Sequence, residues 1–216
     1  MSLKVKLATT IAALCMVICL LTVGVWAATK TSVNVSGTVS FVAEDVNATI
    51  SATVTGATGD EQNITNKVIA TFLGDEVIPE GSDYYEYEDK DGNKTYDFKD
   101  LDFASKDSVI VITLTIKNDS TQRKLNVDSF TATLGTGTPT KLTADVPAED
   151  AKETFAGSNV VAWISQEAPT TKIAPEGTAT VAISLRVANT NLKVNAAPFA
   201  ATLQLSNAGE YVPEGE

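Results

Sequence analysis

One segment of the sequence has residue types and spacing suited to binding a metal ion. Asp89, Asp91 and Asn93 alternate along the chain, and Asp100 stands at the twelfth position counted from Asp89. Carboxylate and amide oxygens at these intervals match the ligand positions of a calcium-binding loop. However, Gly92 is the fourth residue, and a lysine occupies the sixth position, where such loops need glycine for a sharp turn. Calcium is therefore a minor alternative here.

The interpretation we favour for the same segment is a β-hairpin, because Asp-Gly between two strands is a strong turn signal. Four tyrosines, Tyr84, Tyr85, Tyr87 and Tyr96, lie on either side of that turn. On a hairpin they would form cross-strand pairs. The alternative is an exposed face that binds a partner or a glycan.

The residue inventory disfavours catalysis. The chain has no histidine, which removes the usual base of hydrolytic triads and the commonest zinc ligand. Carboxylate pairs alone can hydrolyse glycosides. Here the acidic residues cluster in expected turns, and Trp163 is the only tryptophan after the N-terminal apolar segment. We expect a protein that is not an enzyme and that needs no cofactor.

The N-terminal segment predicts export. Lys4 and Lys6 precede an apolar run over residues 7–25, and Val25 and Ala27 occupy the −3 and −1 positions of a cleavage site. We expect a signal peptide, cleaved after Ala27 or one residue later. The alternative is a retained membrane anchor, because the run is nearly as long as the roughly 20 residues that span a bilayer.

Cleavage would remove both cysteines, Cys15 and Cys19, so the exported chain would have no disulfide. Such a chain suits a Gram-positive exterior better than a small disulfide-rich module. Of 16 basic residues, 14 would remain against 27 acidic ones, for a net charge of −13. This charge disfavours nucleic acid and anionic lipid as partners. We expect a signal peptide over 1–27, one domain over 28–206 and a loose acidic tail over 207–216.

Apolar residues alternate with polar ones along most of the remaining chain, and this period of two predicts strands. The alternation is seen in Val33–Phe41, Val46–Val54, Ile112–Ile116, Ala179–Val187 and Phe199–Leu205. The run that begins at Ser108 is apolar on both faces at first, as in a central strand. In a later run, the phase of the alternation changes between Val127 and Phe130, and this change predicts a bulge near Asp128-Ser129. Only Ala148–Phe155 resembles a helix.

With proline and glycine between the runs, this pattern predicts an all-β fold. We expect an antiparallel β-sandwich, jelly-roll-like or immunoglobulin-like, preceded by the signal helix.

Three segments, in combination with the signal, resemble exported Gram-positive proteins of the TasA and camelysin type. They are Ser36-Gly-Thr-Val-Ser-Phe-Val-Ala-Glu-Asp-Val-Asn-Ala-Thr-Ile50, Ile112-Thr-Leu-Thr-Ile-Lys-Asn118 and Ile173-Ala-Pro-Glu-Gly-Thr-Ala-Thr-Val-Ala-Ile183. The resemblance implies processing by a signal peptidase of the SipW kind. It also implies a jelly-roll-like sandwich that assembles into extracellular matrix fibres.

These observations lead us to expect a secreted, non-enzymatic structural protein at the cell surface, a subunit or accessory of a biofilm-matrix fibre. Its partners would be copies of itself or sibling matrix proteins, and a signal peptidase during export, with no stable membrane insertion after cleavage. Assembly would proceed by β-strand addition. The candidate assembly strand carries Val33, Val35, Val39 and Phe41. The alternative is a monomeric adhesion module that binds a glycan or a host protein.

Four segments match the acceptor pattern for N-glycosylation, at Asn47, Asn63, Asn93 and Asn118. In a chain so rich in threonine, such matches arise readily by chance, and we assign them no function.

Overall fold

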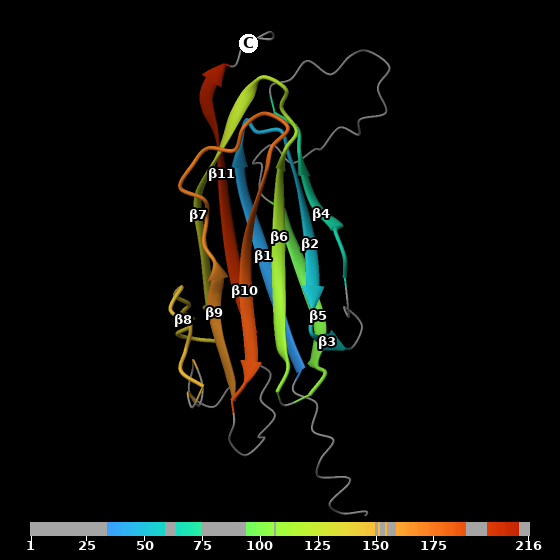
Figure 1. Ribbon diagram of the computed structural model, residues 1–216, viewed down its shortest axis with the longest axis vertical. Coiled ribbons are helices and arrows are strands. Elements are labelled where there is room, and N and C mark those ends of the chain that lie inside the picture. Colours follow the sequence, from blue (N-terminus) through green and yellow to red (C-terminus); the bar gives the residue numbers. More distant parts are fainter. Residues whose placement is uncertain are drawn as a thin grey trace, which may run out of the picture. The chain divides into compact units, whose positions relative to one another are not determined.

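The computed structural model describes residues 34–58, 64–74, 94–105, 107–149, 151, 154, 159–188 and 198–211, which all belong to one unit, Val33–Glu216 (Figure 1). Every regular element in this part of the chain is a strand, so the all-β prediction is confirmed. The expected signal helix lies outside the described residues. The strands are β1 Asn34–Glu44, β2 Ala48–Thr55, β3 Ala57–Thr58, β4 Lys67–Phe72, β5 Lys94–Phe103, β6 Val109–Asn118, β7 Arg123–Leu134, β8 Thr140–Lys141, β9 Val160–Gln166, β10 Thr178–Val187 and β11 Phe199–Tyr211.

The strands form two sheets, with the orders β3-β5-β1-β11-β7-β8 and β4-β2-β6-β10-β9. All neighbouring pairs but one are antiparallel, as predicted. The exception is β1, which pairs with β11 in parallel, Gly37 opposite Phe199 and Glu44 opposite Ser206. In Figure 1 the blue β1 and the red β11 run side by side in the same direction. Parallel neighbours need a long connection, and here almost the whole domain connects them.

The inward side chains of the two sheets share one hydrophobic core. Phe41 and Leu203 from the first sheet belong to the same buried cluster as Ile50, Leu114 and Ile183 from the second. The strand β6 lies at the centre of its five-stranded sheet, which confirms the central position that its apolar run predicts.

The predicted bulge is confirmed in β7. Gln204 of β11 lies opposite Ser129, but the next residue, Leu205, lies opposite Val127, so Asp128 is the extra residue. Leu125 and Phe130 are five positions apart and would face opposite sides of a regular strand. The bulge resets the phase, and both side chains are buried.

The structure differs from the expectations at several places. We did not expect β4, and we did not expect β9, whose five consecutive buried residues show no alternation. They are buried on both faces, because Val161 and Trp163 form a second small cluster with Ala188 on the side away from the main core. Strand β11 also continues to Tyr211, so the first part of the expected tail belongs to a strand.

The helix expected over 148–155 is a further difference, because none of its described residues is helical. Thr154 instead binds the edge of β9. Its backbone N–H donates to Val160 O (2.9 Å), and its Oγ1 accepts from Ala162 N (2.6 Å) and donates to Ala162 O (3.2 Å). These bonds satisfy edge groups that a helix would leave open. No described segment is a helix capable of spanning a membrane.

Candidate functional site

Strand β1 holds three of the four candidate assembly residues, since Val33 lies outside the described residues. Val35, Val39 and Phe41 are fully buried. The strand lies inside the six-stranded sheet, with β5 on one side and β11 on the other. The first described strand is thus an interior strand of its own domain.

The slot between β5 and β11 fits β1 closely at Gly37. A Cβ atom at this position would lie 2.3 Å from two ring carbons of Phe199 on β11. The ring of Phe199 in turn packs against that of Phe98 on β5, with 6.0 Å between centroids. The two aromatic rings therefore leave room for a strand with glycine at this point, and larger side chains would have to displace them.

Of the four tyrosines, Tyr96 is described, and Tyr84, Tyr85 and Tyr87 lie outside the described residues. Tyr96 is on β5, and its ring packs edge-on against Phe98 with 4.9 Å between centroids. Its hydroxyl accepts a hydrogen bond from Lys67 Nζ (2.7 Å), which also lies 5.2 Å from the ring centroid. Tyr96 therefore joins β5 to β4 of the other sheet.

Of the four candidate calcium ligands, Asp100 lies in the part of the chain that is described. Asp89, Asp91 and Asn93 fall outside it. Asp100 is exposed on β5 with a φ of 50°, where the pairing with β1 shifts register. Among the described residues no group of three potential metal ligands occurs.

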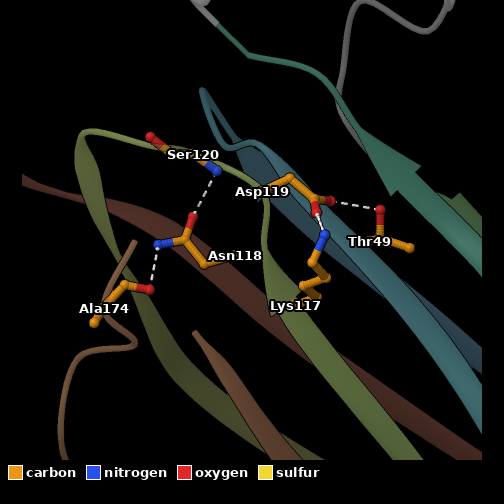
Figure 2. A network of polar contacts seen from close by, with 6 residues as sticks. All are labelled: Thr49, Lys117, Asn118, Asp119, Ser120 and Ala174. Carbon is orange, nitrogen blue, oxygen red and sulfur yellow. Dashed lines mark hydrogen bonds and ion pairs between the residues drawn. The ribbon is translucent and has the colours of Figure 1, made fainter. Parts of the chain in front are cut away.

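A polar cluster that the sequence did not single out for function surrounds the turn between β6 and β7 (Figure 2). Asn118 is 1% exposed, and its Nδ2 donates to the carbonyl oxygens of Arg123 (2.8 Å), Ala174 (3.1 Å) and Ile173 (3.3 Å). Its Oδ1 accepts from Ser120 N (3.1 Å). One buried amide thereby connects the β6–β7 turn to the segment before β10. An acceptor asparagine enclosed in this way is closed to glycosylation in the folded chain.

Next to Asn118, the carboxylate of Asp119 binds two side chains on the outer surface (Figure 2). Asp119 Oδ1 accepts from Lys117 Nζ (2.6 Å), and Oδ2 accepts from Thr49 Oγ1 of β2 (2.5 Å). The hydrogen bond and the negative charge of Asp119 raise the pKa of Lys117 above its ordinary 10.5.

A pocket of about 380 Å³ opens beside this cluster. The turn from β1 to β2, the turn from β6 to β7 and the far part of β11 line it, and Asp45, Asn47, Arg123, Lys124 and Asn207 are among its polar residues. The sequence does not show this pocket, because its walls come from segments that are far apart in the chain.

Comparisons of the chain with protein-family models, with curated proteins and with solved structures find no match.

Proposed function

We propose that this chain is an exported structural protein that forms, or is an accessory of, an extracellular matrix fibre of the TasA and camelysin type. In this proposal the two sheets form a jelly-roll-like β-sandwich, the segment before it is a cleaved export signal, and the subunits join by β-strand addition.

The observation that carries the proposal is the place of β1. It begins at Asn34, a few residues after the expected cleavage site, and it lies between β5 and β11. Because its neighbours come from later parts of the chain, the β1 of a second copy could fill the same slot with the same pairing and burial. An exchange of identical elements is a low-cost route to assembly.

The timing of processing supports this route. A first strand that is still joined to an export signal is tethered until cleavage, which would restrict exchange to the outside of the cell. The acidic composition, with a net charge of −11 for the whole chain, favours solubility of the subunit before assembly.

A pair of introduced cysteines tests the exchange directly. Ser40 on β1 lies opposite Thr95 on β5, with 3.4 Å between their hydroxyl oxygens, and both are accessible. The mature chain has no other cysteine, so Ser40→Cys with Thr95→Cys would give a single disulfide of suitable geometry. If the proposal holds, the oxidised monomer forms no fibres, and reduction restores concentration-dependent growth without added ligand.

The same variant reports on the fibres themselves. When fibres grown under reducing conditions are then oxidised, exchanged strands give a ladder of covalent multimers on a denaturing gel without reductant. The control is Thr131→Cys with Thr202→Cys, which joins β7 to β11 and gives cross-linked monomers only. Fibres from the oxidised Ser40/Thr95 variant at the wild-type rate would refute the exchange of β1. A mature chain that stays monomeric at every concentration would refute self-assembly.

A further inference from the structure

The strongest unassigned feature is the side chain of Asn47 in the pocket at the β1–β2 turn. Asn47 is 9% exposed, and its Oδ1 accepts a hydrogen bond from the backbone N–H of Gly74 (2.5 Å). A backbone N–H can only donate, so this contact determines which end of the amide is the oxygen. The other end, Nδ2, donates to no acceptor among the residues that the structure describes.

The position of Asn47 is held by a close approach of two backbone segments. A Cβ atom at Gly74 would lie 2.6 Å from the carbonyl carbon of Asp45 and 2.7 Å from the nitrogen of Val46, so a larger residue would push the segments apart. The carbonyl of Asn47 also accepts from Asp119 N (2.9 Å). With its oxygens engaged in this way, Asn47 has its Nδ2 left as a donor, and this atom is not among the buried polar atoms that lack a partner, so it is accessible to a ligand in the pocket.

The rest of the pocket indicates the class of ligand. Val46 and Leu125 are buried and provide apolar contact, whereas Arg123 and Lys124 bring two positive charges and Asp45 one negative charge. Most of the remaining lining residues carry neutral amides or hydroxyls. A volume of about 380 Å³ lies within the range of small-molecule sites.

We propose that this pocket binds a carboxylated sugar, such as a uronic acid residue of an acidic polysaccharide. Arg123 and Lys124 attract the carboxylate, Asn47 Nδ2 donates to a ring or hydroxyl oxygen, and Asp45 accepts from a hydroxyl group. Val46 and Leu125 contact the C–H groups of the ring. The site belongs to a subunit whose β1 lies in its own sheet, because exchange of β1 would make the β1–β2 turn that lines the pocket the link between two subunits. The binding test therefore uses the monomeric mature chain.

The test is a titration of the mature chain with D-glucuronate, followed by NMR chemical shifts and calorimetry. We expect saturable binding with shifts at the pocket residues, and D-glucose and acetate binding at least tenfold more weakly. Acetate as tight as glucuronate would indicate a simple carboxylate site, and glucose as tight would indicate a neutral-sugar site. Either result, or no saturation by glucuronate, would overturn the proposal.

The matched variant is Asn47→Asp, which keeps an oxygen for Gly74 N–H but replaces the Nδ2 donor with a second oxygen. We expect it to weaken glucuronate binding at least tenfold. Lys124→Gln leaves the Asn47 contacts in place and should weaken binding several-fold at low salt. Lys141→Gln makes the same charge change outside the pocket and should leave affinity unchanged. Equal affinities of wild type, Asn47→Asp and Lys124→Gln would refute the site.

Discussion

At the scale of single residues, Asn118 shows how one buried amide substitutes for regular pairing. The carbonyl groups of Arg123, at the start of β7, and of Ala174, in the segment before β10, lie within hydrogen-bond distance of the Asn118 side chain. Asn118 Nδ2 satisfies them, and its backbone N–H adds a bond to Gly177 O (2.9 Å). The same residue matches a glycosylation pattern in sequence, but its environment gives it a structural role.

We therefore expect Asn118→Ala to reduce the free energy of unfolding by about 3 kcal/mol, because it removes the hydrogen bonds that the buried amide makes with Arg123 O, Ala174 O and Ser120 N. Urea denaturation measures the change. The control is Asn126→Ala on β7, where the side chain is half-buried and makes no such contact; it should cost about 0.5 kcal/mol or less. Similar costs for the two variants would contradict the role of Asn118.

The Lys117–Asp119 pair gives a prediction for pH. Folding raises the pKa of Lys117 above its ordinary 10.5, so the folded state favours the charged amine. The resulting stabilisation is complete below pH 10.5 and is lost as the pH rises through the folded pKa. An NMR titration of the Lys117 side chain should show the raised pKa, and Asp119→Asn should lower it. An unchanged pKa in that variant would show that Asp119 is not the cause.

At the scale of elements, the position of β1 in its sheet is determined by pairing with β5 on one side and β11 on the other. The buried positions of β1 alternate with half-buried hydroxyl residues, and at the buried position of Gly37 the ring of Phe199 occupies the space where a side chain would lie. Aromatic rings that cover a glycine on an adjacent strand can fix strand register. The glycine in the sequence is thus a contact of the β1–β11 pair, and not a break in the strand.

We expect Gly37→Ala to destabilise the fold by about 2 kcal/mol, because the new methyl group must displace the ring of Phe199. The double variant Gly37→Ala with Phe199→Leu should cost less than the sum of the single variants, since a smaller side chain relieves the clash. The coupling, about 1 kcal/mol, is measured by a double-mutant cycle in urea. Strict additivity would show that Gly37 and Phe199 do not interact.

At the scale of the whole molecule, the first and last described strands are parallel neighbours near the middle of one sheet. The sheet is therefore incomplete until the end of the chain is available, and its closure depends on contacts of the longest sequence separation. The completion of the sheet therefore depends on β1, the first described strand, as well as on β11.

The processing prediction belongs to this scale. Secreted protein should begin at Ala28 or Thr29, because Val25 and Ala27 suit the cleavage-site positions. Amino-terminal sequencing of protein from the culture medium checks this. Recovery of Met1 or Ser2 would instead support a chain that keeps its N-terminal segment as an anchor.

The sequence by itself determined most strands, because the alternation of buried and exposed side chains is local and has a period of two. It also determined the bulge at Asp128, since a phase change along one strand is visible without knowing its partner. Strand β9 was missed, because burial on both faces removes the alternation, and β4 was missed as well. A helix was expected over 148–155, but none of the described residues in this range is helical.

Only the tertiary structure decided which strands are neighbours. The parallel pairing of β1 with β11 joins opposite ends of the chain, and no local pattern encodes so distant a partner. The pocket could not be predicted from the sequence for the same reason. Asn47, Arg123 and Asn207 are unremarkable as separate polar residues, and they line one site because three segments meet at the same end of the two sheets.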